Sequence, residues 1–269
     1  VYHNTLGTIS KNYERTGDWN NFEVKNISKP FVEIKNENFE TWDAAIYKCI
    51  SERMYSPEQA GYGNVRAAFF PLFPILWKIT HCSPIGISLL NYLIFTISIA
   101  MLIIVLLKTT FVNQMIAYAV LITLPSTISY YIPYSESLFL FTMTLATIGL
   151  IKKKYWVFFI GCFLLAMVRP ATAFVFIAIL FTELLIFISQ RQFRLFLKEI
   201  ITKSLPFILG YFCTFFIQYL YSGSWTAFFD ARKHWNPTVS FSSFSDWSVE
   251  GFGLSVFAIF FLCIPAIGF

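Results

Sequence analysis

The chain has 269 residues, of which 57% are hydrophobic and only 13% are charged, and its mean hydropathy is +0.62. Because soluble domains carry about a quarter charged residues, this composition excludes an ordinary soluble protein and predicts a membrane protein. The net charge of +5 does not indicate a nucleic-acid partner, since the basic residues cluster at the ends of apolar runs, where membrane topology accounts for them. The five cysteines form no CxxC or Cys/His pattern, so we expect neither a disulfide framework nor a zinc site.

The polar residues are concentrated at the start of the chain, where residues 1–66 hold 17 of the 35 charged residues. We therefore expect residues 1–83 to form an extracytoplasmic first loop with interfacial or re-entrant helices. Residues 84–269 are expected to form a transmembrane bundle that includes an outer loop at 222–250. Because the chain begins at Val1 and ends within an apolar stretch, we also expect further structure before and after it.

The apolar runs predict an all-α, multi-pass helical bundle. A helix needs about 20 apolar residues to cross a bilayer core about 30 Å thick. The predicted spans are 84–107, 111–131, 133–151, 155–168, 171–188, 200–221 and 251–269. The segment 67–79 is also apolar but short and interrupted by two prolines, so it fits a re-entrant or interfacial piece.

Charge predicts the sidedness of these spans. If they alternate, the connections at Lys108, 152–154 and 189–203 carry 8 basic residues and 1 acid, which marks them as cytoplasmic. The polar segments of the other connections would then converge on the outer face, as an extracytoplasmic active site requires. A transporter would instead carry ionisable groups near mid-membrane. We expect Glu183, within a span, to be paired or to snorkel.

The stretch "TWDAAIYKCI" (41–50) predicts an interfacial helix with Asp43 in its first turn and Thr41 as its N-cap. Helical spacing places Trp42 on one apolar face with Ala45, Ile46, Cys49 and Ile50, and turns Asp43, Tyr47 and Lys48 elsewhere. The residues alone leave open whether Asp43 is a functional carboxylate or a first-turn acid favoured by the helix dipole.

Two further motifs place charge at the outer ends of spans. "PYSESLF" puts Glu136 beside Tyr134, either as a site carboxylate or as a solvated helix start. The span at 155–168 is only about 21 Å long at 1.5 Å per residue, so Arg169 lies below the outer headgroups. An arginine at that depth has to snorkel, pair or line a wet cavity.

The stretch 221–237 interleaves charge with aromatic side chains, which suits either a phosphate and a sugar ring or an interfacial aromatic belt. Its candidate residues are Asp230, Arg232, Lys233, His234 and Trp235. The sequence has no DxD, Walker, GxSxG or HExxH motif, so we expect no metal, no nucleotide and no other cofactor.

Read in order, "WDAAIYKCISERMY", "AAFFPLFPILWK", "YSESLF", Arg169 and "YSGSWTAFFDARKHW" resemble the PIG-V family of mannosyltransferases, relatives of GPI mannosyltransferase 2 among the GT-C glycosyltransferases. The resemblance covers about residues 41–237. The matching positions are Trp42, Asp43, Tyr47, Gly61, Tyr62, 69–74, 134–139, Arg169, Gly223 and Trp235. The chain departs from the family pattern at Thr41, at 170–172 and after Gly223.

The resemblance implies a GT-C architecture and a polyprenyl-phosphate sugar donor, with mannose as the sugar and a glycan or glycolipid as acceptor. It assigns Asp43 as the base of an inverting transfer. The implied donor-binding residues are Arg169, His234, Arg232, Lys233, Glu136 and Tyr134, supported by Trp42, Tyr47 and Trp235. We expect the bacterial inner membrane with a periplasmic site, with the endoplasmic reticulum membrane and a lumenal site as the alternative.

Two other functions stay open at this stage. A flippase-like transporter of lipid or glycan would line the interior of several spans with polar side chains. A non-catalytic subunit of a membrane complex would keep the motifs without turnover, and the departures at Thr41 and Pro170 are compatible with it.

Overall fold

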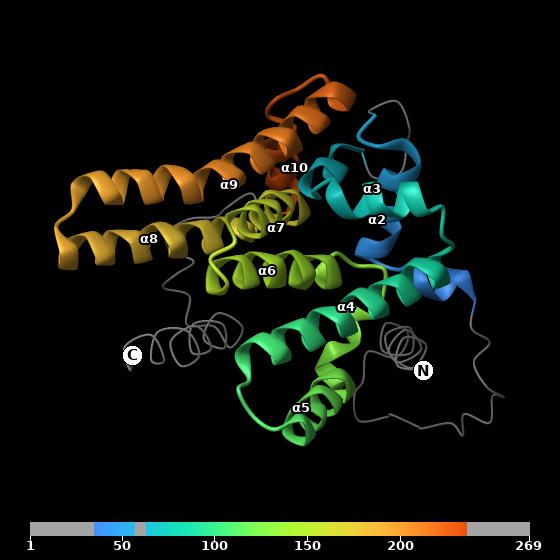
Figure 1. Ribbon diagram of the computed structural model, residues 1–269. Helices are drawn as coiled ribbons and strands as arrows, with labels where there is room; N and C mark the ends of the chain where they lie inside the picture. Colours follow the sequence, from blue (N-terminus) through green and yellow to red (C-terminus); the bar gives the residue numbers. More distant parts are fainter. Residues whose placement is uncertain (1–34, 57–62, 236–269) are drawn as a thin grey trace, which may run out of the picture.

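The computed structural model describes residues 35–56 and 63–235, and over these residues it contains helices and no strand (Figure 1). The elements are η2 (Asn36–Phe39), α2 (Asp43–Arg53), η3 (Gly63–Ala68), α3 (Leu72–Thr80), α4 (Pro84–Leu106), α5 (Phe111–Thr123), η4 (Pro125–Tyr130), α6 (Glu136–Ile151), α7 (Tyr155–Val168), α8 (Thr172–Gln190), α9 (Phe193–Ser222) and α10 (Ala227–Trp235). The all-α prediction is confirmed for these residues. The predicted span at 251–269 lies outside them.

Three of the described helices, α4, α8 and α9, are long and apolar enough to cross a membrane, and α5, α6 and α7 are shorter apolar helices. The burial of α8 has the pattern expected in lipid. Its buried residues are Thr172 and Glu183, whereas Phe174 and Phe181 are exposed. Such a large exposed apolar surface marks contact with lipid or protein, so the chain is a membrane protein.

Two predicted spans have different boundaries in the structure. The run at 111–131 does not form one helix, because α5 ends at Thr123 and the short η4 begins at Pro125, a residue that disfavours helix before it. Conversely, α9 begins at Phe193 rather than at 200, since Arg, Lys and Glu in its first turns are good helix formers. The predicted connection at 189–203 therefore shrinks to the short turn between α8 and α9.

Glu183 of α8 is paired, as predicted from its place inside a span. Lys203 of α9 donates to its carboxylate at 2.5 Å and lies 3.2 Å from Glu199. An ionisable group at membrane depth is tolerated when it has such a partner. The ion pair fastens the α8–α9 hairpin in the half nearer its turn.

The helices form a bundle with a separate group of short helices at one end (Figure 1). α6 packs against α4 and α7, and α7 also packs against α9. The α8–α9 hairpin extends beyond the other labelled helices at the left of the view, and α2 and α3 lie at the right. With nine residues, α3 is too short to cross a bilayer, and it occupies most of the segment expected to be interfacial or re-entrant.

Glycines allow the central helices to approach closely. A Cβ at Gly161 of α7 would lie 2.4 Å from the backbone nitrogen of Ala146 in α6. A Cβ at Gly149 would lie 2.2 Å from the nitrogen of Phe158, and one at Gly210 would lie 2.4 Å from the oxygen of Phe163. Small residues serve the same purpose in other membrane bundles, where packing rather than water exclusion holds helices together.

We expect Gly161→Ala to destabilise the protein by about 1–3 kcal/mol, because the added methyl group forces α6 and α7 apart. Thermal unfolding in detergent measures the effect. Gly86→Ala is the matched control, since the atom nearest to the added methyl group would be Cβ of the Cys82 side chain, at 3.2 Å, rather than a backbone atom. Equal stability of the two variants would contradict the close α6–α7 contact.

Candidate functional site

Asp43 is the first residue of α2, and the turn before it differs from the prediction. The N-cap is Trp42 rather than Thr41, with φ 52° and without a side-chain cap hydrogen bond. Such a backbone conformation costs a non-glycine residue about 1–3 kcal/mol and is found where the surrounding structure fixes it. The Trp42 side chain is 70% exposed, whereas Ile46 and Ile50, which the sequence places on the same face, are buried.

The buried face of α2 includes Tyr47, although helical spacing predicts that this residue lies off the apolar face. Tyr47 is 4% exposed, and its hydroxyl lies 2.8 Å from the hydroxyl of Ser135, which precedes α6. Its ring meets Phe69 and Phe73 edge to face, at centroid distances of 5.1 and 5.0 Å. The helix that carries Asp43 is therefore joined directly to the start of α6.

Arg169 and Glu136 form an ion pair between the end of α7 and the start of α6. The guanidinium Nη1 donates to Oε1 of Glu136 at 2.7 Å. α7 ends at Val168, and Arg169 is extended, as expected for a residue before proline. Of the possibilities open to an arginine at this depth, pairing is the one that the structure shows.

The turn that precedes Glu136 is held by two polar side chains of α4. Asn91 donates to the carbonyl oxygens of Ile132 at 2.6 Å and Tyr134 at 2.9 Å, and the Ser88 hydroxyl donates to that of Tyr131. Neither side chain was predicted to have this role. Their available signal was the presence of two polar side chains three positions apart, and so on one helix face, within an apolar span.

Electrostatic interactions connect Asp43 with this group. Burial raises the pKa of Asp43, and the nearby positive charge of Arg169 opposes the rise. The pKa of Tyr134 is raised to about 12 by burial, and then by the negative charges of Asp43 and Glu136. Burial also raises the pKa of Tyr47, whose hydroxyl is close enough to interact with all three charged groups. We call these five residues the Asp43 cluster: Asp43, Tyr47, Tyr134, Glu136 and Arg169.

The cluster places a carboxyl group of raised pKa near a guanidinium group. The Asp43 carboxylate forms no hydrogen bond with any described residue, and its raised pKa suits proton transfer better than an ordinary surface carboxylate does. Arg169 has five N–H donors, and the Glu136 contact uses one nitrogen. The remaining donors can bind an anion such as a phosphate.

Glu136 contacts Arg169 through only one of its two carboxylate oxygens. One carboxylate oxygen, Oε1, accepts from Arg169. The other, Oε2, is enclosed and has no hydrogen-bond partner among the described residues. The ion pair orients the Arg169 guanidinium, and the role of Glu136 in binding the donor stays a prediction.

The other predicted site residues lie on or around α10. Arg232 and Lys233 are exposed, and neither contacts the Asp43 cluster within the described part of the chain. Lys233 pairs at 2.8 Å with Asp230 on its own helix. His234 and Trp235 belong to α10, but their side chains lie outside what the structure describes. α10 reaches α2 through Ala231, which is buried with Ile46 and other side chains.

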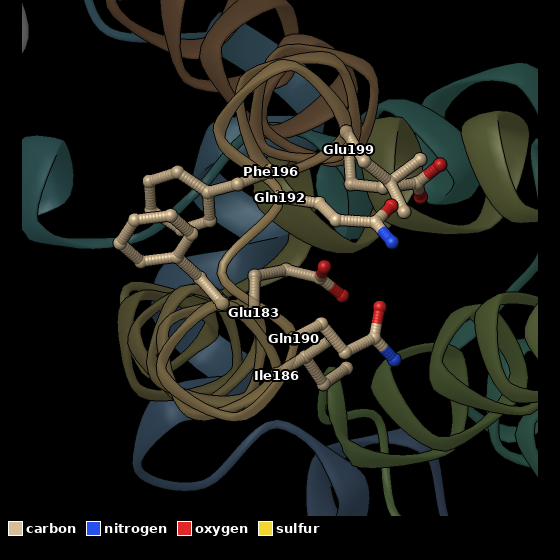
Figure 2. Close-up of a pocket in the computed structure, with 8 residues that line it drawn as sticks. Glu183, Ile186, Gln190, Gln192, Phe196 and Glu199 are labelled. Atoms are coloured by element: carbon tan, nitrogen blue, oxygen red, sulfur yellow. The ribbon is translucent and has the colours of Figure 1, made fainter.

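Two small pockets occur among the described residues, at opposite ends of the bundle. One, of ≈30 Å³, lies at the α8–α9 turn, where the polar ends of Glu183, Gln190, Gln192 and Glu199 point to one side and the Phe196 ring to the other (Figure 2). The other, of ≈10 Å³, lies beside Asp43 and is lined by Asn38, Phe39, Thr41, Ala44, Ile132, Pro133 and Tyr134. The smaller pocket is the one near Asp43, because Thr41 and Ala44 on either side of that residue line it together with Tyr134.

The described residues include no group of three or more His, Cys, Asp or Glu side chains that could hold a metal ion. Comparison with known proteins found no matching family model, no matching curated protein and no matching solved structure. The resemblance to the PIG-V family therefore stays a prediction from motifs, and the Asp43 cluster carries the functional argument.

We expect Asp43→Asn to raise the unfolding temperature near neutral pH. The folded-state pKa of Asp43 is raised, so ionising this carboxyl costs more in the fold than in the unfolded chain. The advantage of asparagine should shrink as the pH falls through the folded-state pKa, and vanish below the unfolded value of about 3.9. The difference in unfolding temperature between the variant and the parent, recorded in detergent across this pH range, measures the effect.

Glu52→Gln is the control, because Glu52 is an exposed acid on the same helix. It should change the unfolding temperature little at any of these pH values. An Asp43→Asn variant that is less stable than the parent at neutral pH would contradict the burial of this carboxyl.

Proposed function

We propose that the protein is a membrane glycosyltransferase that transfers a sugar from a polyprenyl-phosphate donor to a glycan or glycolipid acceptor. The observation that carries the proposal is the Asp43 carboxylate, which has a raised pKa, forms no hydrogen bond with the described residues and lies near the Arg169 guanidinium. A base beside an anion-binding group is what transfer from a phosphate-linked sugar requires. The PIG-V resemblance adds mannose as the sugar.

In this reaction Asp43 accepts the proton of the acceptor hydroxyl as its oxygen attacks the anomeric carbon. The bond between that carbon and the phosphate oxygen breaks, and the lipid phosphate leaves with the bonding electrons. A single displacement of this kind inverts the anomeric configuration. Arg169, oriented by Glu136, stabilises the charge that develops on the phosphate.

A lipid-linked donor fits the position of the cluster. Glu136 and Arg169 lie at the ends of apolar helices, and α2 lies beside them at the same end of the bundle (Figure 1). A donor held in the bilayer by its polyprenyl chain could present its phosphate there. We propose that this end faces the periplasm from a bacterial inner membrane, with the lumen of the endoplasmic reticulum as the alternative.

The buried polar side chains within the apolar helices do not favour a transporter. Thr142, Thr144 and Ser98 bond the carbonyl oxygen four residues earlier in their own helix. Hydroxyls satisfied in this way need no partner from a neighbouring helix or a permeating molecule. The paired Glu183 is likewise occupied by Lys203.

We expect the parent protein to transfer mannose from polyprenyl-phosphate mannose to a pool of glycan and glycolipid acceptors, and Asp43→Asn to transfer it about 100- to 10,000-fold more slowly, the usual contribution of a general base. Radiolabelled product formed by purified protein in liposomes measures the rate. Glu52→Gln should retain the parent rate. Full transfer by a folded Asp43→Asn variant would exclude Asp43 as base. A parent that transfers no sugar from any lipid-phosphate donor would overturn the proposed function.

A further inference from the structure

A buried hydrogen bond joins the base-bearing helix to the ion pair. It runs at 2.8 Å between the hydroxyls of Tyr47 and Ser135, which are 4% and 0% exposed. Tyr47 follows Asp43 by four positions, so the two lie on the same side of α2. Ser135 immediately precedes Glu136. The bond therefore links the helix that carries Asp43 with the residue before Glu136, which is the ion-pair partner of Arg169.

Packing leaves the Tyr47 ring little freedom to move. Phe69 and Phe73 meet it edge to face. The same buried core contains Leu138, two residues after Glu136, and Val168, the residue before Arg169. With the ring fixed against α3, α6 and α7, its hydroxyl fixes the distance between α2 and the start of α6.

Tyr47 is poorly suited to be a second base. Burial raises its pKa, so the phenol keeps its proton over the whole range in which Asp43 titrates. Its hydroxyl is also engaged with Ser135. Tyr47 can therefore contribute to sugar transfer only by positioning other groups.

We propose that Tyr47 and Ser135 are positioning residues, whose hydrogen bond sets the Asp43 carboxylate against Arg169. The inference rests on the proposed function for its kinetic consequence, but the placement of Asp43 can be measured without turnover. A general base has to be within hydrogen-bond reach of its proton, and a displacement of about 1 Å at a reacting group costs about 100-fold in rate.

The test compares Tyr47→Phe, Ser135→Ala and their double variant in the full-length protein. Each single variant should lower kcat by about 10- to 100-fold and change the KM for the lipid donor by less than about two-fold. The double variant should be no slower than the slower single variant, because one bond is lost in all three. Tyr55→Phe is the matched control, since its buried hydroxyl donates to the carbonyl of Phe69 at 2.8 Å and not to the turn before α6.

The second measurement is the titration of Asp43, followed through its infrared carboxyl band and assigned with Asp43→Asn. The charged and titratable groups near Asp43 are Arg169, Tyr47 and Tyr134. If the carboxylate drifts from the guanidinium, its titration should move to higher pH in Tyr47→Phe and Ser135→Ala. It should stay at the parent value in Tyr55→Phe.

The outcomes separate the two proposals. If Tyr47→Phe and Ser135→Ala shift the Asp43 titration but the parent transfers no sugar, the positioning bond is supported and the proposed transferase is overturned. An active parent, with Tyr47→Phe as fast as Tyr55→Phe and an unshifted titration, would overturn the positioning bond and leave the transferase standing. Additive losses of kcat in the double variant would also overturn the positioning bond, because they would show that the two hydroxyls act separately.

Discussion

The ion pair of Arg169 with Glu136 is the interaction on which the arrangement of the site depends. It connects the end of α7 with the first residue of α6, two helices in extensive contact. α7 is a short apolar helix of 14 residues, and the Arg169 side chain that follows it is only partly exposed, so its charge is stabilised by a partner. The short helix and the ion pair thus belong together, and Glu136 is held where the guanidinium can serve an incoming anion.

The same requirement, that polar groups in apolar surroundings be paired, shapes the turn before α6. After η4 the chain leaves regular helix, and its carbonyl groups lose their helical donors. Asn91 and Ser88 supply donors from α4, and Ser137 donates to Tyr130 at 2.6 Å. The satisfied turn fixes Ser135, and through it both Tyr47 and Glu136. The geometry of the site therefore originates partly in α4, which contributes no member of the Asp43 cluster.

The sequence predicts features that depend on local pattern. α7 has the predicted bounds because its apolar run ends at an Arg-Pro pair, and Glu136 begins a helix where the motif places it. The pairing of Glu183 also follows from its apolar context. In each case the signal lies within about one helical turn of the residue concerned.

Features that depend on contact between distant segments were not predictable in this way. The burial of Tyr47 was not predicted, because helical spacing shows which residues share a face but not which face is packed. The partners of Asn91 and the close approach at Gly161 involve helices more than ten residues away in sequence. Without such contacts, an asparagine or glycine in an apolar run does not identify the segment that it will contact. The break of 111–131 at Pro125 was the exception, since that signal was local.

The members of the Asp43 cluster differ in how tightly they are held. Glu136 and Arg169 bind each other, and Tyr47 is packed and hydrogen-bonded. Asp43 has no hydrogen bond with a described residue, and it follows Trp42 at a positive φ. Local rules are broken in folded proteins mainly where function requires it. The proposed function requires Asp43 to accept a proton, so a strong partner for this carboxylate would stabilise the protein while lowering the pKa on which that proposed role depends.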